Sequence, residues 1–351
     1  MAKNNGFINN IEFEKQVLRL KSFPKIIFVE TTRNCNLKCS MCERALRYGN
    51  TYNGNLNMDE KTLLHVAEIL YEKAEIVDYH GNGEFLCYPL FFDAINLALK
   101  HDCKLRTVTN LCTTDKQRLE ALANHFDFLC VSLDSPYKDR YELLRIGAKY
   151  ELVTENLKFL VNRGRTDIII MMTIAFDNLQ ELCEMIKLVA TLGINKLYIW
   201  QRFLPEEDDN NIKFHLEDAK IILHDAVKTA NKYNVELRML SWPQHCNFNY
   251  DSSPCIKPWM SIHINYDGEV GICDFNETPD DFKGLNINEQ SFLKIWNSKK
   301  YIELRKRHVS KEYIKFCSDF CIGKRFVDFE EILYLPKKQE IVSGEKILSI
   351  L

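Results

Sequence analysis

The sequence predicts an α/β fold with a parallel sheet that forms an open, partial (β/α)6 barrel. Short β-branched or apolar runs alternate with longer helical stretches, and this alternation is typical of βαβ units. Six such units, joined by short links, follow one another between residues 25 and 240. We therefore expect their strands to close most of a barrel, with the helices outside it.

The elements are expected in the following order. The strands are Lys25–Thr32, Glu75–His80, Lys104–Asn110, Phe126–Asp134, Ile168–Phe176 and Lys196–Phe203, followed by a last short run at Val235–Leu240. The helices are Asp59–Lys73, Pro89–His101, Thr114–His125, Glu151–Arg163, Leu179–Leu192 and His215–Tyr233.

The composition changes near residue 241, where Pro, Cys, Asn, Ser and aromatic residues replace the alternation, and we place a domain boundary there. Two strand-like runs, Trp259–Asn265 and Glu269–Cys273, flank a Tyr-Asp-Gly turn, which predicts a β-hairpin. One helix is expected at Gln290–His308. The chain then divides into an N-terminal extension (1–24), a barrel (25–240), a small cysteine-rich domain (241–325) and a tail (326–351).

Composition and charge exclude several classes of protein. The 351 residues carry 46 Lys and Arg against 49 Asp and Glu, a net charge of −3, so the chain lacks the basic surface of a nucleic-acid-binding protein. No apolar run reaches the roughly 18 to 20 residues of a membrane span, and the N-terminus is polar. We expect a cytoplasmic protein, where the 13 cysteines stay reduced.

Three of these cysteines, Cys35, Cys39 and Cys42, follow the first predicted strand with the spacing C-x3-C-x2-C. Loops at this end of barrel strands build active sites. Three thiolates so spaced can bind three irons of one [4Fe–4S] cube and leave the fourth iron open to a ligand. A zinc site usually needs a fourth Cys or His nearby, and unligated core cysteines are the other alternative.

The triplet resembles the signature of the radical S-adenosylmethionine (radical SAM) superfamily, whose members have a partial, TIM-like (β/α)6 barrel. The segment His80–Phe85 is similar to the family's Gly-Gly-Glu-Pro turn, although Asn82 and Phe85 replace a glycine and the proline. The resemblance implies that Gly81, Gly83 and Glu84 bind the methionine amino group of S-adenosylmethionine (SAM). A solvated turn is the alternative reading.

Further cofactor contacts are implied at three other places. In Phe128–Asp134 the apolar residues alternate, so Cys130, Ser132 and Asp134 should point into the barrel. The resemblance makes Ser132 and Asp134 candidates for the cofactor ribose or carboxylate. Two more residues, Arg145 and Asn110, occupy positions where related enzymes place cofactor contacts, and an exposed helical arginine is the alternative for the first.

Four cysteines form a second set. Cys255 and Cys273 have the spacing C-x12-G-x4-C across the predicted hairpin, and Cys317 and Cys321 supply two more thiols. The set resembles the twitch module, the shorter relative of the SPASM domain, which implies one auxiliary [4Fe–4S] cluster and thus two clusters in the chain. A structural zinc is the alternative, and Cys246 is a spare ligand.

The resemblance implies an enzyme that cleaves SAM to a 5′-deoxyadenosyl radical, using an electron donor such as flavodoxin or ferredoxin. Alternation in 196–202 turns Tyr198, Trp200 and Arg202 inward, where aromatic faces and a guanidinium suit a sugar- or nucleotide-like substrate. Core packing is the alternative for both aromatic residues. We expect a small, polyhydroxylated metabolite as the substrate.

Oxidation with help of the auxiliary cluster is the outcome we favour. The alternative is epimerisation, in which an inward thiol returns a hydrogen atom; Cys130 is the candidate donor, with Cys112 and Cys246 behind it. A peptide or protein maturase is a further alternative, which the short segment of about 25 residues before the first strand disfavours. A non-catalytic scaffold protein that binds zinc is the third alternative.

Overall fold

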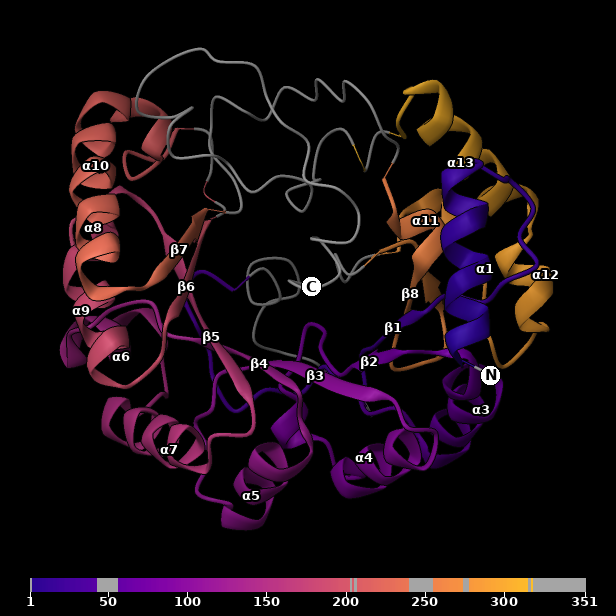
Figure 1. The fold of residues 1–351 in the computed structure, drawn as a ribbon, viewed down its shortest axis with the longest axis horizontal. Helices are drawn as coiled ribbons and strands as arrows, with labels where there is room; N and C mark the ends of the chain where they lie inside the picture. The colour runs from indigo at the N-terminus through magenta and orange to yellow at the C-terminus, as the bar shows by residue number, and fades with distance from the viewer. Residues whose placement is uncertain are drawn as a thin grey trace.

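The computed structural model describes residues 2–42, 56–202, 204, 207–239, 255–273, 278–314 and 317. These residues form an α/β fold around one nine-stranded sheet with the order β7-β6-β5-β4-β3-β2-β1-β8-β9. Neighbouring strands from β7 to β8 are parallel, and β9 is antiparallel to β8. Figure 1 shows the strands as an arc with helices outside it, the partial barrel that the alternation predicts.

All six predicted strands and the short seventh run are present. The strands are β1 (Ile26–Val29), β2 (Ile76–Asp78), β3 (Lys104–Thr109), β4 (Phe128–Ser132), β5 (Asp167–Ile174), β6 (Lys196–Gln201), β7 (Glu236–Met239), β8 (Ser261–Ile264) and β9 (Val270–Gly271).

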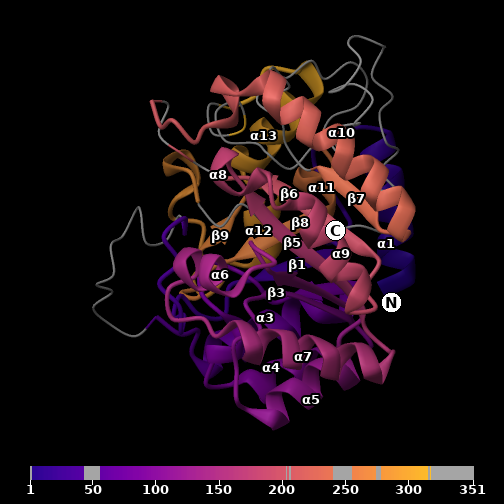
Figure 2. The same ribbon diagram turned by 90° about the vertical axis from the view of Figure 1, so that its left-hand side faces the viewer.

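Helices follow the strands and cover the outer face of the arc, as Figures 1 and 2 show. The α-helices are α1 (Ala2–Glu14), α3 (Glu60–Leu70), α4 (Phe91–Lys100), α5 (Lys116–His125), α6 (Lys138–Leu144), α7 (Tyr150–Arg163), α8 (Phe176–Leu179), α9 (Leu182–Thr191), α10 (Leu216–Tyr233), α11 (Lys257–Met260), α12 (Phe292–Trp296) and α13 (Lys299–Ser310). Short 3₁₀ turns are η1 (Tyr71–Lys73), η2 (Phe85–Cys87), η3 (Ile212–Phe214) and η5 (Asp280–Phe282).

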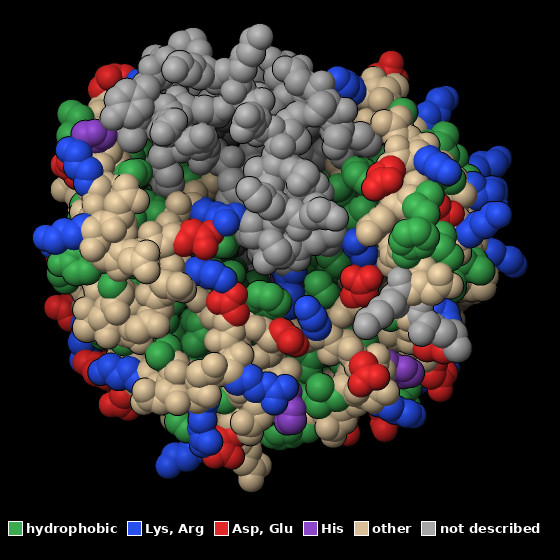
Figure 3. All heavy atoms as spheres, viewed as in Figure 1, with side chains coloured by type: hydrophobic (Ala, Val, Ile, Leu, Met, Phe, Trp, Pro, Cys, Tyr) green, Lys and Arg blue, Asp and Glu red, His purple; other side chains and the backbone are tan. Residues whose placement is uncertain are grey.

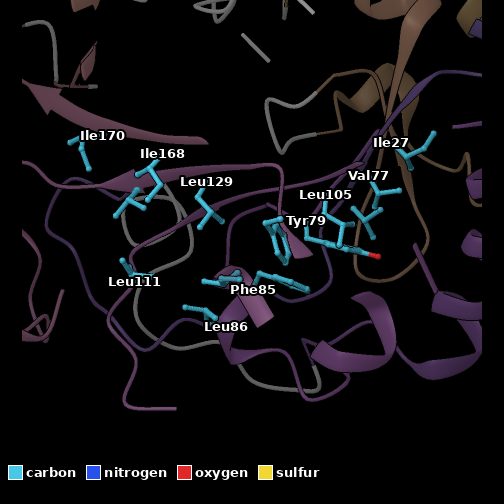
Figure 4. Close-up of a cluster of buried hydrophobic side chains, with 14 of the residues drawn as sticks. Ile27, Val77, Tyr79, Phe85, Leu86, Leu105, Leu111, Leu129, Ile168 and Ile170 are labelled. Atoms are coloured by element: carbon cyan, nitrogen blue, oxygen red, sulfur yellow. The ribbon is translucent and has the colours of Figure 1, made fainter. Parts of the chain in front are cut away.

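The two faces of the sheet differ in their side chains. On the outer face, apolar residues of successive strands are buried against the helices; Figure 4 shows Ile27, Val77, Leu105 and Leu129 among them. The inner face carries the alternate residues, because successive side chains of a strand point to opposite faces. In β4 this places Leu129 and Val131 in the core and leaves Cys130 partly accessible, as predicted.

The single helix predicted at 290–308 is wrong: two helices, α12 and α13, occupy this stretch. The break falls at Asn297 and Ser298, two residue types that favour helix caps over helix interiors. The Ser298 hydroxyl accepts a hydrogen bond from Tyr301 N at 3.3 Å and begins α13. The Asn297 side chain bonds the backbone of Leu20 at 2.8 and 2.9 Å, which ties this region to the N-terminal extension.

The predicted hairpin is present as β8 and β9, and its first strand extends the barrel sheet. β8 pairs in parallel with β1, with Ile26 opposite Ser261 and Phe28 opposite His263. α1 covers this end of the sheet, where Asn9 Nδ2 donates to Trp259 O at 2.7 Å. Among the described helices, none combines the length and the apolar character that crossing a membrane requires.

Candidate active site

The cysteine triplet lies on the loop that follows β1. Cys39 is buried, whereas Cys35 and Cys42 are half-buried. Two backbone hydrogen bonds hold the loop against the end of α6: Lys38 N donates to Ile146 O at 2.9 Å and Ser40 N to Leu144 O at 3.1 Å. The three predicted iron ligands are therefore kept on one short, anchored segment.

Two of these thiols have N–H donors beside them. Asn110 Nδ2 is 3.8 Å from Cys35 Sγ, and Arg145 Nη1 is 4.0 Å from Cys39 Sγ. Burial raises the pKa of the Cys39 thiol, and the nearby Arg145 guanidinium opposes this rise. Donors of this kind stabilise the thiolates that iron requires. The donor set therefore fits an iron–sulfur cluster with three protein ligands.

The described residues do not form a compact site for a single metal ion. Within the described part of the chain, no group of three or more His, Cys, Asp or Glu side chains lies close enough together to hold one ion. A [4Fe–4S] cube is larger than one ion, so its thiolates are spread more widely than the ligands of a tetrahedral zinc.

The turn Gly81–Glu84 docks directly on the cysteine loop. Glu84 N donates to Asn34 O at 2.8 Å. A Cβ atom on Gly83 would lie 2.2 Å from Thr32 O and 2.7 Å from Asn34 O, so only glycine allows this approach. The predicted turn and the predicted cluster loop are thus adjacent in the structure.

Glu84 lies beneath this turn and is 3% exposed. Its carboxylate accepts hydrogen bonds from Thr109 Oγ1 at 2.8 Å, Asn110 N at 2.7 Å and Leu86 N at 3.2 Å. Burial raises the pKa of Glu84, and these hydrogen bonds only partly oppose it. The carboxylate therefore connects the turn to the end of β3, an arrangement that the sequence did not indicate.

Asp134, two residues after the end of β4, contacts Arg145. Asp134 is fully buried, and its Oδ2 accepts from Arg145 Nε at 2.6 Å while its Oδ1 accepts from Thr173 N at 2.7 Å. Ser132 is the last residue of β4 and is partly accessible. The structure thus groups Asp134 and Arg145 with the cysteine loop, because Arg145 contacts both Asp134 and Cys39.

Sequence reasoning missed Glu30, Arg33 and Tyr266. The Glu30 side chain is fully buried at the end of β1; its carboxylate accepts from Arg33 Nε at 2.9 Å and from Asn82 N at 2.9 Å. The Arg33 guanidinium lies 4.8 Å from the centre of the Tyr266 ring, at the tip of the β8–β9 hairpin. A buried acid at the end of a barrel strand is the signal that could have found this group.

A second missed group lines the inner face of β2 and β3. Asp78 is opposite Arg106 in the sheet and accepts from Arg106 Nη2 at 2.9 Å and from His80 Nδ1 at 2.8 Å. Two residues further along β3, Val108 is opposite Cys130 and is 39% exposed. This part of the inner face is therefore polar, and Val108 beside it is accessible to solvent. Figure 3 shows both acidic and basic side chains on the molecular face that Figure 1 views.

The predicted substrate residues of β6 differ in accessibility. Tyr198 is 4% exposed, and its hydroxyl donates to Glu236 Oε1 at 3.3 Å. Arg202 is buried and forms an ion pair with Asp177 at 3.2 Å, which Arg140 also contacts at 2.6 Å. Trp200 is partly exposed beside Thr173 of β5. Of the three, Trp200 is the most accessible to a ligand.

The structure describes three of the four cysteines in the C-terminal set. Cys255 precedes α11 and Cys273 follows β9, and both are half-buried. Cys317 Sγ lies 3.7 Å from His308 Nε2, a buried ring on α13. Cys321 and Cys246 lie outside the described residues.

Comparison with known proteins agrees with this geometry. Residues 29–189 match the family model "Radical SAM superfamily", and residues 255–321 match the SPASM "Iron-sulfur cluster-binding domain". A tungsten-containing aldehyde ferredoxin oxidoreductase cofactor-modifying protein of Pyrococcus furiosus is 23% identical over 332 residues, covering 87% of this chain and 89% of that protein.

Two solved structures share the fold. Streptococcus suis SuiB bound to S-adenosylmethionine superposes with a TM-score of 0.63 at 17% identity, covering 86% of this chain and 72% of that chain. Native anSMEcpe with bound AdoMet superposes with a TM-score of 0.63 at 16% identity, covering 84% of this chain and 87% of that chain. The chain belongs to the radical SAM superfamily and carries a C-terminal SPASM iron–sulfur domain.

Proposed function

We propose that this radical SAM enzyme abstracts hydrogen from a small, polyhydroxylated, sugar- or nucleotide-like metabolite and oxidises it with help of one auxiliary [4Fe–4S] cluster. The family chemistry, when cluster and cofactor are bound, is one-electron cleavage of SAM to a 5′-deoxyadenosyl radical. Cys35, Cys39 and Cys42 would hold the barrel cluster. The turn Gly81–Glu84 and the group Ser132, Asp134 and Arg145, with Asn110, would hold SAM beside it.

The observation that carries the substrate class is the inner face of the barrel. Asp78, His80 and Arg106 form a hydrogen-bonded, charged group there, and Val108 on the same face of β3 is 39% exposed. Polar side chains on rigid strands suit a ligand with several hydroxyl groups, because each buried hydroxyl needs a partner. Trp200 adds an aromatic face on which a ring could stack.

The oxidation balances in electrons and protons. Removal of a hydrogen atom from a carbinol carbon leaves a carbon radical next to a hydroxyl. Loss of the hydroxyl proton and one electron then gives a carbonyl, a net two-electron oxidation of the substrate. Cys255, Cys273, Cys317 and Cys321 would hold the group that accepts this electron.

Anaerobic reconstitution tests the proposal. The full chain is loaded with iron and sulfide and incubated with SAM, reductant and a metabolite extract of the host organism. Mass spectrometry should show 5′-deoxyadenosine and one metabolite that becomes lighter by two hydrogens. The experiment in deuterated water should leave the attacked carbon without solvent deuterium. Deuterium at that carbon in the wild-type reaction, and its absence in the Cys130→Ala reaction, would instead show epimerisation. Formation of 5′-deoxyadenosine together with changes in peptides alone would show a peptide maturase.

The Pyrococcus furiosus relative favours a second candidate. It matches nearly the whole chain, and its name describes modification of the cofactor of an oxidoreductase. In this candidate the substrate is a precursor of an oxidoreductase cofactor. Incubation with an extract from cells that lack this chain would test this candidate, since an unmodified cofactor precursor should accumulate there and be consumed.

A one-electron donor completes the proposed reaction. We propose flavodoxin or ferredoxin in this role, because reductive cleavage of SAM needs an electron of low potential. Replacing dithionite by reduced flavodoxin or reduced ferredoxin in the same assay, and measuring 5′-deoxyadenosine, distinguishes these donors. Failure of both proteins, with dithionite still active, would contradict this choice of donor.

A further inference from the structure

The side chain of Asn110 lies against the thiol of Cys35. Asn110 Nδ2 is 3.8 Å from Cys35 Sγ and 2.9 Å from Asn36 Oδ1. The backbone N–H of Leu37 donates to the same sulfur at 3.4 Å. Asn110 itself is 6% exposed, so water screens this contact poorly. Two N–H groups from different parts of the chain therefore converge on one cysteine sulfur.

Neighbouring hydrogen bonds determine which end of the Asn110 amide faces the sulfur. Asn110 Oδ1 accepts from Cys112 N at 2.8 Å. Asn36 Nδ2 donates to Cys112 O at 2.7 Å, which leaves Asn36 Oδ1 to face Asn110. Flipping the Asn110 amide would put its NH₂ group against the Cys112 N–H and its oxygen against Asn36 Oδ1. The donor end therefore points at Cys35.

The loop that carries Asn110 is held in an unusual backbone conformation. Leu111 is fully buried with a φ of 54°, a value that residues other than glycine seldom adopt. Leu111 N donates to Thr109 Oγ1 at 3.0 Å. Asn156 Nδ2 donates to Leu111 O at 3.0 Å and to Thr113 O at 2.8 Å. Such conformations persist where surrounding contacts enforce them, and they cluster at functional sites.

We propose that Asn110 is a positioning residue that raises the reduction potential of the barrel cluster through its hydrogen bond to the Cys35 sulfur. Hydrogen bonds to cluster sulfurs are among the determinants of iron–sulfur potentials, because they stabilise the more negative, reduced state. Asn110 thereby determines how strong a one-electron donor must be. The inference rests on the proposed function only in requiring a cluster at Cys35, Cys39 and Cys42.

Redox titration followed by electron paramagnetic resonance tests the proposal on the reconstituted full chain. The barrel cluster is recognised as the reduced signal that is lost when Cys35, Cys39 and Cys42 are replaced together by Ala. We expect Asn110→Ala to shift its midpoint potential to a more negative value. Asn156→Ala is the matched control, because it removes two hydrogen bonds from the same loop and contacts no thiol. Its midpoint should stay at the wild-type value.

An unchanged midpoint in Asn110→Ala would overturn the proposal, and so would an equal shift in Asn156→Ala, which would assign the effect to loop geometry. If Asn110→Ala loses iron, Asn110→Asp serves as the second variant, because it keeps the acceptor for Cys112 N and replaces the N–H donor by an oxygen. The midpoint potential of Asn110→Asp should also fall. A constant or higher midpoint potential would overturn the proposal. These potentials are measured without any metabolite. Failure to find an oxidised metabolite would therefore affect the proposed function alone.

Discussion

The guanidinium of Arg33 lies over the ring of Tyr266, 4.8 Å from its centre, and so connects the cysteine loop to the hairpin of the SPASM region. On its other side Arg33 pairs with Glu30, whose carboxylate also accepts from Asn82 N in the glycine turn. Burial raises the pKa of Glu30, and Arg33 opposes this rise. One cation thus joins three parts of the site that are far apart in the sequence.

We predict that Arg33→Ala lowers the free energy of unfolding by about 3 kcal/mol, because it leaves the buried Glu30 carboxylate without its cation. Tyr266→Leu should cost about 1 kcal/mol, the size of a cation–π contact. Urea denaturation measures both. The double variant Arg33→Ala with Glu30→Gln should recover much of the lost free energy of unfolding, because it removes the unpaired charge. A double variant as unstable as Arg33→Ala alone would contradict this role of the Glu30 charge.

Gly83→Ala should separate the glycine turn from the cysteine loop. Its Cβ would lie 2.2 Å from Thr32 O, a backbone atom that cannot move aside cheaply. We expect loss of iron from the barrel cluster and weaker SAM binding, measured by iron analysis and calorimetry. The control is Gly164→Ala, where φ is 65° and no atom lies within 4 Å. It should cost about 1 kcal/mol of stability and leave iron content unchanged; equal iron loss in both variants would refute the argument.

The buried Glu84 carboxyl group should make the free energy of unfolding depend on pH. Because burial raises its pKa, the folded state binds the proton more tightly than the unfolded state does. Its contribution to the free energy of unfolding is therefore largest at low pH and falls as the pH rises from the ordinary glutamate value through the raised one. The stability of wild type relative to Glu84→Gln should fall in urea denaturation as the pH rises above the ordinary glutamate pKa.

The matched control for this measurement is Glu155→Gln, since Glu155 is exposed on α7. Its stability difference from wild type should stay constant over the same range. A wild-type advantage over Glu84→Gln that grows with pH would show that the hydrogen bonds from Thr109 and Asn110, and not burial, dominate this carboxylate.

Cys130 should remain a thiol at neutral pH. Burial raises its pKa to about 12, and nearby Asp78 adds to the rise. Alkylation by iodoacetamide requires the thiolate, so folded protein at about pH 8 should leave Cys130 unlabelled while urea-unfolded protein is labelled. Peptide mass spectrometry reads out both. Rapid labelling in the folded protein would rule out the protonated thiol that hydrogen-atom donation needs.

Iron content tests the number of clusters. Reconstituted wild type should bind about eight irons, and replacement of Cys35, Cys39 and Cys42 together by Ala should leave about four. Replacement of Cys255, Cys273 and Cys317 together should also leave about four. Cys183→Ala is the control outside both sets and should keep the wild-type count. A wild-type count near four would remove the auxiliary cluster from the proposal.

The order of strands and helices was predictable from the sequence because each depends on local periodicity. The run 168–174 alternates around a buried core face, and β5 forms there. Likewise, the spacing of Cys35, Cys39 and Cys42 is a local property, so the cluster loop could be placed after β1 before any contact was known. The break between α12 and α13 was missed because helical periodicity continues across Asn297, whose side chain instead bonds the distant Leu20.

Only the tertiary structure decided how distant segments meet. That β8 pairs with β1, that Arg33 reaches Tyr266, and that Asn110 meets Cys35 all depend on sheet register and loop geometry across many intervening residues. Local pattern carries the two-residue period of a strand and therefore predicts which face a side chain takes. It carries no information on which residue of another strand lies opposite, because that choice is made by packing of the whole sheet.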